Sequence, residues 1–385
     1  RVEKVNRGEN YIHDVDEQDL RRLVSSGALR AYAGFDLVPH MDVVVICVPT
    51  PLTRNLTPDL QYVERVTREV AKRLRVGQLI SLESTTYPGT TEELMLPILC
   101  ESGLVPDRDF FLVHSPERVD PGNKHYTTRN ICKVVGGIGP ASVEVAVAFY
   151  SQTVGRVITV SSARAAELVK VFENTFRAVN IALVNELALL CDRMSLNVWE
   201  VLDAAFSKPF GIMPFYPGPG VGGHCVPVDP HYLEWKAKEL NFNTHFIGLA
   251  GEINRSMPAF VRDKASRILN SMGIPPSRAK LLVLGVAYKR DVADCRESPA
   301  IEVIRLLRQV GATVAYHDPW VPSFRDRELE MSSIPLTEAT LGEADLVIIT
   351  TDHSNVDYEW VVRHARHVFD TRNATRKVTA DRGKI

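Results

Sequence analysis

The stretch DVVVICVP, residues 42–49, is a continuous run of apolar and mostly β-branched residues. Such a run is typical of a strand that is buried on both faces of a parallel sheet. Similar runs alternate with helical patterns through the first 160 residues, with strands predicted at 78–83, 110–114 and 156–160 and helices at 63–74, 90–99 and 143–153. This alternation predicts an α/β sheet with right-handed crossovers.

The pattern changes at residues 161–194, which contain neither Pro nor Gly. Apolar residues recur there at helical spacing, and Ser161 or Ser162 is the candidate N-cap. A helix of this length spans roughly 50 Å at 1.5 Å per residue. Because that exceeds one small domain, we expect the helix to bridge two domains or two subunits.

A second α/β pattern starts at Lys280, after a Gly- and Pro-rich loop at 207–230 and further helix to about residue 272. It predicts strands at 281–288, 313–319, 344–352 and 367–373 and a helix at 298–311, with Ser298 as N-cap, Pro299 in the first turn and Gly311 as the stop. The fold class that follows is α/β, with two Rossmann-like parallel-sheet domains joined by a long central helix.

Composition excludes several classes of protein. The 385 residues include 45 Lys and Arg against 47 Asp and Glu, a net charge of −2, which argues against a nucleic-acid partner. The longest apolar runs are far shorter than the roughly 18 residues that a membrane span needs. Six cysteines with no C-x-x-C pair argue against a zinc ribbon and indicate a reducing, cytoplasmic compartment.

The strongest local motif is GPGVGGHC, residues 218–225. Its glycines permit positive φ and close approach to a ligand, and Cys225 is exposed to whatever the loop holds. The alternative is a linker with an incidental thiol, although Asp229 four residues later makes a polar site more plausible. A zinc site using His224, Cys225 and His231 lacks a second ligand cluster, so we expect no metal.

Lys170 and Asn174 lie four residues apart, hence on one face of the long helix. They could stabilise a developing oxyanion. Spacing alone favours a simpler interpretation, in which both residues lie on a solvated edge.

Thr50, Thr85 and Glu117 each follow the carboxyl end of a predicted strand, the edge where open α/β sheets bind ligands. Three such residues in succession describe the rim of a crevice, although Glu117 could equally be an exposed loop carboxylate.

In the second α/β region, Lys289 and Arg296 lie between a strand and a capped helix, an arrangement suited to binding phosphate.

Taken in order, these motifs closely resemble the nucleotide-sugar 6-dehydrogenases, the UDP-glucose/UDP-N-acetylhexosamine dehydrogenase family. The matching pieces are VPTP (48–51), EST (83–85), SPERVDPGN (115–123), Lys170 with Asn174, GPGVGGHCVPVDP (218–230) and GVAYKRDVADCRESPA (285–300). The segments 114–123, 173–188, 215–233 and DTRN (370–373) look most like the branch that oxidises UDP-N-acetylglucosamine. The UDP-glucose branch usually has a Lys where this chain has Val228.

The resemblance implies an NAD-binding domain at 1–160, a central helical dimerisation domain at 161–272 and a UDP-sugar-binding domain at 273–385. It also implies oxidation of a C6 alcohol to a carboxylate with two NAD. Family roles carry over by motif, and the resemblance implies Cys225 as nucleophile, Lys170 and Asn174 at the oxyanion, Asp229 as base or water-orienting group and Glu117 in thioester hydrolysis. It implies Thr85 as a catalytic residue beside the nicotinamide and the reacting water, Thr50 beside NAD, Gly222 and Lys289 at the substrate, and Arg296 at cofactor or phosphate.

The family begins with a strand, a G-x-G-x-x-G turn, a helix and a second strand, whereas residues 1–6 resemble the segment that follows them. We therefore expect a fragment that binds NAD poorly and whose first sheet is truncated.

Alternatives to the UDP-N-acetylglucosamine enzyme are the same reaction on UDP-glucose or UDP-N-acetylmannosamine, a non-catalytic UDP-sugar-binding protein, and a cysteine hydrolase using Cys225 with His224 or His231. A homodimer through the long helix is also expected.

Overall fold

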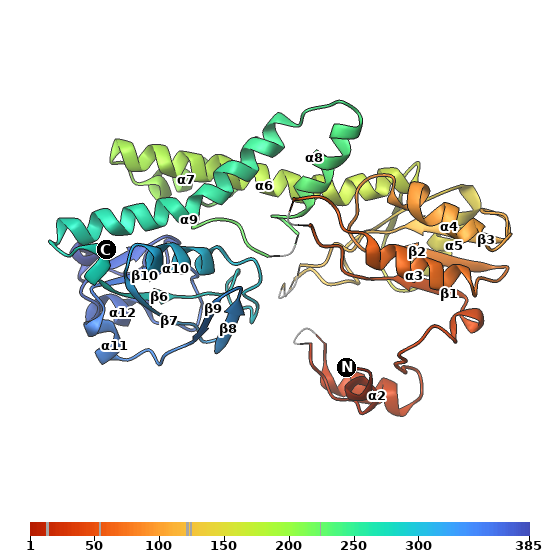
Figure 1. Ribbon diagram of the computed structural model, residues 1–385, viewed down its shortest axis with the longest axis horizontal. Helices are drawn as coiled ribbons and strands as arrows, with labels where there is room; N and C mark the ends of the chain where they lie inside the picture. The colour runs from red at the N-terminus through yellow and green to blue at the C-terminus, as the bar shows by residue number, and fades with distance from the viewer. Residues whose placement is uncertain (13–14, 54, 121–122, 124, 224) are drawn as a thin grey trace. The chain divides into compact units, whose positions relative to one another are not determined.

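A computed structural model describes residues 1–12, 15–53, 55–120, 123, 125–223 and 225–385 (Figure 1). The chain divides into two compact units, Arg1–Phe172 and Glu173–Ile385, which are described separately below. Within the described residues, no helix is long and apolar enough to cross a membrane.

The first unit is built on a five-stranded sheet in the order β1-β2-β3-β4-β5. The neighbours β1, β2 and β3 run parallel, β4 is antiparallel to β3, and β5 is parallel to β4. The strands are β1 (Val43–Ile46), β2 (Gln78–Leu82), β3 (Phe110–His114), β4 (Lys133–Gly137) and β5 (Val157–Thr159). The expected Rossmann-like α/β fold is confirmed, with parallel β1, β2 and β3 and one antiparallel pairing at β4, a strand that the sequence pattern did not reveal.

Helices cover both faces of this sheet because its strands carry apolar side chains on both sides. On one face Ile46, Ile80 and Leu112 pack with Val63 and Leu99 of the helices, and on the other Leu79 and Val113 pack with Ala146 and Tyr150. The helical segments of this unit are α1 (Val2–Asn6), α2 (Glu17–Ser25), η1 (Val38–His40), α3 (Gln61–Ala71), η2 (Thr91–Met95), α4 (Leu96–Cys100) and α5 (Pro140–Tyr150).

The long helix predicted after residue 160 is confirmed as α6 (Ala163–Met194), with 32 residues. Ser162 is its cap, since the Ser162 hydroxyl accepts a hydrogen bond from the Ala165 amide at 3.1 Å. The helix begins in the first unit and ends in the second.

The second unit contains a parallel four-stranded sheet in the order β11-β10-β6-β7 and a separate antiparallel hairpin, β8-β9. The four predicted strands and the capped helix α10 are confirmed, whereas the hairpin was not predicted. The strands are β6 (Lys280–Leu284), β7 (Thr313–His317), β8 (Ser323–Asp326), β9 (Leu329–Ser332), β10 (Leu346–Ile349) and β11 (Val368–Asp370).

Helices also cover the second sheet. α9 and α10 pack on one face through Val261, Leu269 and Leu307, and α11 and α12 pack on the other through Leu341 and Val361. The helical segments are α7 (Val198–Phe206), α8 (Asp229–Glu239), α9 (His245–Ser271), η3 (Pro276–Arg278), α10 (Pro299–Gln309), α11 (Glu338–Glu343), α12 (Tyr358–His364) and η4 (Arg382–Lys384).

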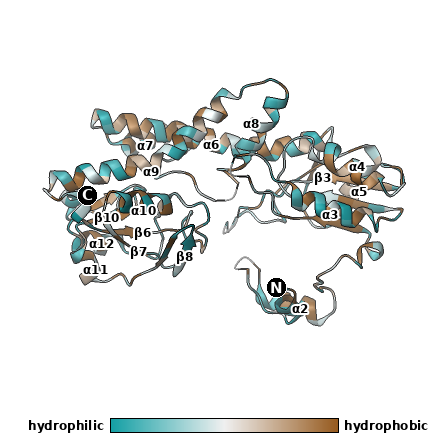
Figure 2. Ribbon diagram, viewed as in Figure 1, coloured by the Kyte–Doolittle hydropathy of each residue, from teal (hydrophilic) through white to brown (hydrophobic). Residues whose placement is uncertain are grey.

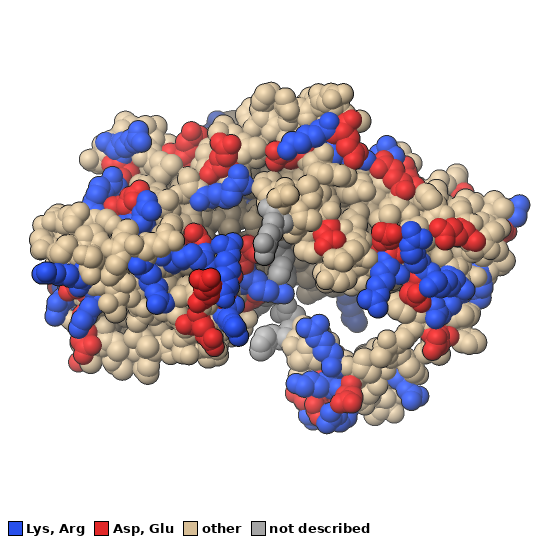
Figure 3. All heavy atoms as spheres, in the orientation of Figure 1, with Lys and Arg blue, Asp and Glu red and all other residues tan. Residues whose placement is uncertain are grey.

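Hydropathy and charge follow this layered arrangement. Figure 2 shows the sheet strands as largely hydrophobic, with polar residues on the outer faces of helices such as α3. On the face shown in Figure 3, Lys and Arg side chains are interspersed with Asp and Glu.

Candidate active site

The glycine loop, defined here as residues 218–223, packs directly against another part of its own unit. Gly220 and Gly223 have positive φ, +133° and +89°. A Cβ on Gly222 would lie 2.9 Å from the Glu297 carbonyl oxygen and from the Tyr288 Cβ. At Gly222 the backbone thus closely approaches protein, so packing within the unit already requires the absence of a side chain there. Contact between these glycines and a ligand stays a prediction.

Two buried amide side chains hold the start of the glycine loop. Asn185 of α6 accepts a hydrogen bond from the Gly218 amide at 3.0 Å, and its own Nδ2 donates to Asn254 of α9 at 2.9 Å. Asn254 in turn donates to the Ala178 carbonyl at 3.0 Å. The loop thus has a fixed attachment to two helices, and sequence reasoning singled out neither asparagine.

A buried cluster lies immediately after the glycine loop. Cys225 is half-buried, and its carbonyl accepts the Asp229 amide at 2.8 Å, where α8 begins. The Asp229 carboxylate accepts a hydrogen bond from Asn174 Nδ2 at 2.5 Å, and both side chains are 2% exposed. The structure therefore unites Asn174, Cys225 and Asp229, and the solvated-edge interpretation is wrong for Asn174. Lys170, one turn earlier on α6, is half-buried.

His231 is engaged away from a cysteine or a metal. Its Nδ1 lies 3.2 Å from Glu234 and its Nε2 lies 3.2 Å from Arg255, while burial lowers its pKa. His224 lies outside the described residues. Across the described part of the chain, no group of three or more His, Cys, Asp or Glu is placed to hold a metal ion. Both ring nitrogens of His231 are therefore engaged by Glu234 and Arg255, and the alternatives that use His224 stay predictions.

Arg372 is a candidate site residue that the motif analysis did not single out individually. It follows β11, donates from Nε to the Thr350 carbonyl at 2.9 Å, and lies against Gly218, where a Cβ would clash with its guanidinium. Burial lowers its pKa. The signal available in the sequence was its position just beyond the carboxyl end of a strand, which is a ligand-binding edge.

The two cationic residues expected at a phosphate behave differently. The Arg296 guanidinium pairs with Asp294 of its own loop, at 2.6 Å from Nη2 and 2.9 Å from Nε. Lys289 is half-buried. Asp318 holds the start of their loop, because its carboxylate accepts hydrogen bonds from the Val286 and Ala287 amides at 2.7 and 2.9 Å.

In the first unit, the loops after β1 and β2 are joined. The Thr50 hydroxyl donates to the Thr85 carbonyl at 2.7 Å, and the Val48 amide donates to the Ser84 hydroxyl at 2.8 Å. The two threonines of the predicted rim therefore lie together at the carboxyl edge of the sheet.

A buried carboxylate on α6 holds the segment that follows β2. Glu167 accepts hydrogen bonds from the Gly89 amide at 2.5 Å, the Thr91 amide at 2.8 Å and the Thr91 hydroxyl at 2.7 Å. Its side chain is fully buried, and this burial raises its pKa to about 7 although the three donors oppose the shift. Sequence analysis did not single out Glu167.

Glu117 is held at both carboxylate oxygens. Oε1 accepts the Arg118 and Val119 amides at 2.8 Å each, and Oε2 lies 3.2 Å from Lys133 Nζ. Burial opposes ionisation, but the Lys133 charge and the two amides outweigh it, so the pKa of Glu117 is lowered. It is therefore an anchored carboxylate rather than a loosely held surface group.

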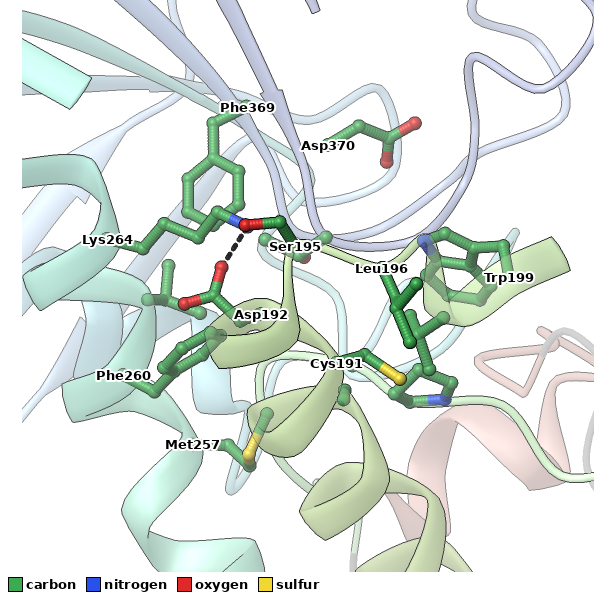
Figure 4. Close-up of a pocket in the computed structure, with 16 residues that line it drawn as sticks. Cys191, Asp192, Ser195, Leu196, Trp199, Met257, Phe260, Lys264, Phe369 and Asp370 are labelled. Carbon is green, nitrogen blue, oxygen red and sulfur yellow. Dashed lines mark hydrogen bonds and ion pairs between the residues drawn. The ribbon is translucent and has the colours of Figure 1, made fainter. Parts of the chain in front are cut away.

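The second unit also contains a cavity of about 320 Å³ that shares Pro217 and Gly218 with the segment leading into Cys225 (Figure 4). One wall carries the ion pair between Asp192 and Lys264, 2.7 Å apart, and Trp199 lies on another. Most of the side chains that line the cavity are apolar, and Pro217 and Gly218 connect it to the segment that leads to Cys225.

Family models match the chain in three consecutive pieces. All three describe the UDP-glucose/GDP-mannose dehydrogenase family: its NAD binding domain matches residues 1–154, its central domain 164–256 and its UDP binding domain 282–377. The chain belongs to the UDP-glucose/GDP-mannose dehydrogenase family. The family resemblance drawn from the motifs is thereby confirmed.

Named relatives of this dehydrogenase act on different sugars. It is 36% identical to the UDP-N-acetyl-D-mannosamine dehydrogenase of Pyrococcus horikoshii, over 97% of this chain and 87% of that protein. It is 33% identical to the UDP-N-acetyl-D-glucosamine 6-dehydrogenase of Pseudomonas aeruginosa, over 92% of this chain and 83% of that protein. The chain is therefore an NAD-dependent UDP-sugar dehydrogenase, and these names leave the sugar open.

Solved structures of this dehydrogenase family share the fold. The UDP-D-ManNAc dehydrogenase of Pyrococcus horikoshii superposes with a TM-score of 0.87 at 35% identity, covering 97% of this chain and 87% of that one. The UDP-glucose dehydrogenase of Pyrobaculum islandicum superposes with a TM-score of 0.85 at 28% identity, covering 98% of this chain and 88% of that one.

The edge containing Thr50 and Thr85 fits the NAD that this dehydrogenase family uses. It lies at the carboxyl ends of the parallel strands β1 and β2, which is where dinucleotides bind in such sheets. In addition, the buried Thr86 hydroxyl makes no hydrogen bond to any described residue.

Proposed function

We propose that this protein oxidises the C6 alcohol of UDP-N-acetylglucosamine to the uronic acid in two steps, in the cytoplasm, for surface polysaccharide biosynthesis. The observation that carries the proposal is the buried cluster of Asn174, Asp229 and Cys225 at the end of the glycine loop. The motifs around residues 114–123 and 215–233 favour the N-acetylglucosamine sugar.

The proposed covalent chemistry uses Cys225. Its thiolate adds to the C6 aldehyde formed in the first oxidation, which gives a thiohemiacetal, and loss of hydride leaves a thioester. Bound NAD supplies the hydride acceptor in each oxidation. Water then attacks the thioester carbonyl, the C–S bond breaks, the electron pair leaves with Sγ, and a water proton passes to a carboxylate.

The surrounding residues have proposed roles that follow from their chemistry. One N–H of the Asn174 amide donates to Asp229, so the amide is fixed and its second N–H can serve a substrate oxygen together with Lys170. Asp229 orients this amide and a water. Glu117, held ionised by its partners, is the proposed proton acceptor in hydrolysis.

The remaining site residues would hold cofactor and substrate. We assign Thr50 and Thr85 to NAD, and Gly222, Lys289 and Arg372 to the UDP-sugar, where Arg372 supplies a cation against the glycine loop. Because Arg296 is paired with Asp294, a phosphate would have to compete with that carboxylate to reach it.

We also propose a homodimer through α6. Its surface carries apolar side chains at Phe176, Leu183, Leu190 and Met194, with Leu183 62% exposed. An apolar row at helical spacing is the pattern expected of a helix that packs against a partner helix.

The test of the proposed function is NADH released per UDP-sugar consumed by the full-length gene product, with wild type and Cys225→Ser side by side. Two NADH per UDP-N-acetylglucosamine with wild type, and no thioester turnover with the variant, are the expected results. UDP-N-acetylmannosamine is the second candidate because a 36%-identical relative is named for it, so a panel of both sugars and UDP-glucose decides the substrate. Absence of NADH with every UDP-sugar would favour a non-catalytic binding protein.

A further inference from the structure

Lys133 of β4 is a buried ammonium between two carboxylates of the first unit. Its side chain is 8% exposed, and Nζ lies 3.0 Å from Glu83 Oε2 and 3.2 Å from Glu117 Oε2. Glu83 is itself only 12% exposed, whereas Glu117 is 47% exposed. Lys133 therefore connects an interior carboxylate to the one that faces outward.

Glu83 has further support that does not depend on Glu117. Its Oε1 accepts a hydrogen bond from the Tyr150 hydroxyl at 2.6 Å, and that hydroxyl lies 2.7 Å from Ser81 Oγ. Burial raises the pKa of Tyr150, so the phenol remains a donor. Lys133 also lies 5.4 Å from the centre of the Tyr150 ring. The ammonium thus retains an anchored partner when Glu117 gains a proton.

Two other titratable groups around Lys133 are neutral. Burial raises the pKa of the Cys47 thiol to about 11 and lowers that of His114 to about 3. Lys133 contacts the carboxylates of both Glu83 and Glu117. A second cation lies nearby, since the Arg118 guanidinium donates from Nη1 to the Cys132 carbonyl at 2.8 Å. A desolvated cation favours the ionised form of a carboxylate that it contacts, and it does so more strongly than in water.

We propose that Lys133 is a positioning residue for thioester hydrolysis: it holds Glu117 as an oriented carboxylate, while Glu83 holds Lys133. The proposal rests on the role of Glu117 in the proposed function. Because Lys133 keeps Glu83 as a partner, its position survives each cycle in which Glu117 takes and releases a proton.

The test compares two substitutions that should shift the acid limb of the kcat–pH profile in opposite directions. Lys133→Met leaves burial in place and removes the cation, so the acid limb should move up by about one pH unit or more. Glu83→Gln keeps a side-chain oxygen that can accept from Lys133 but removes the negative charge that competes for the ammonium, so the limb should move down. Lys133→Arg should restore the wild-type limb.

A second measurement follows the covalent intermediate with UDP-N-acetylglucosamine and NAD as the probes. In Lys133→Met, an NADH burst and an acyl adduct on Cys225, seen by mass spectrometry, should accompany a steady-state kcat that falls further below the wild-type value as the pH is lowered. The KM for the UDP-sugar should change by less than about threefold, because Lys133 acts on hydrolysis and not on binding.

The outcomes separate the two proposals. Wild-type activity in Glu117→Gln would refute the proposed role of Glu117. If Glu117→Gln stalls with the adduct, an unshifted acid limb in Lys133→Met, or an upward shift in Glu83→Gln, overturns the inference about Lys133. If Lys133→Met fails to fold, the direction of the acid-limb shift in Glu83→Gln and the kcat–pH profile of Lys133→Arg still test the inference about Lys133.

Discussion

Asn174 and Asp229 are 55 positions apart in the sequence, yet the Asn174 amide donates to the Asp229 carboxylate across 2.5 Å with both side chains buried. A helix residue and the first residue of α8 thereby fix each other next to Cys225. An amide that donates to a buried carboxylate is both a structural partner and a preorganised donor, because one of its two N–H groups is used and its orientation is set.

Replacing Asn174 by Ala should affect folding and catalysis together. The buried Asp229 loses a donor, which should lower the free energy of unfolding by about 1–3 kcal/mol. Loss of a fixed oxyanion donor should lower kcat by roughly 10²–10³-fold. Urea unfolding and NADH kinetics measure the two effects. Asn180→Ala is the matched control, since that α6 amide makes an exposed bond to Phe176; an equal kcat loss there would contradict the assignment.

Gly222→Ala should disrupt the attachment of the glycine loop. The added Cβ would lie 2.9 Å from the Glu297 carbonyl and from Tyr288, so the loop or its support must shift. We expect a KM for the UDP-sugar raised by about 10-fold or more, since small displacements of positioning groups are costly. Gly248→Ala in α9, where nothing lies within 4 Å of the new Cβ, should instead be neutral or stabilising by up to about 1 kcal/mol.

Glu167 should make stability depend on pH. Its pKa is raised from 4.5 to about 7, so between these values the native state binds the proton more tightly than the unfolded chain does. Its contribution to stability therefore falls as pH rises from about 4.5 to 7, by about 3 kcal/mol at 1.36 kcal/mol per unit, and is constant above pH 7. Urea midpoints of wild type and Glu167→Gln at pH 5 and 8 test this. A stability difference independent of pH would contradict the prediction.

Leu183→Glu should dissociate the proposed homodimer. A carboxylate placed in the apolar row of α6 would be buried against a second copy, which is unfavourable without a partner cation. Light scattering at micromolar concentration should report a dimer for wild type and a monomer for the variant. Val201→Glu on α7, 39% exposed, is a control for added surface charge; a wild-type protein that is already a monomer would refute the dimer.

Sequence patterns predicted most of the fold because its regular elements carry strong local signals. The apolar runs gave β2 and β3, and the Pro- and Gly-free stretch gave α6 with its Ser162 cap. β4 was not predictable in this way, because KVVGG is short and ends in two glycines, which are poor strand formers. The β8-β9 hairpin, made of two four-residue strands rich in charge, gave no clear alternation.

The candidate site was predictable in composition but not in contacts. Motif resemblance named Cys225, Asp229 and Asn174, yet helical spacing alone favoured a solvated edge for Asn174, because burial of that face depends on α8. Lys133 carried no local pattern, and its role depends on β4 lying beside β3. Contacts between residues far apart in sequence are set by topology, which periodicity does not encode.

The anchor of the glycine loop consists only of amides. Asn185, Asn254 and the Gly218 backbone contain no group that gains or loses a proton between pH 4 and 10 and none that salt can screen. The segment that leads to Cys225 should thus keep its attachment across acid, alkali and ionic strength. Variation of enzymatic rate with these conditions should therefore not arise from this attachment.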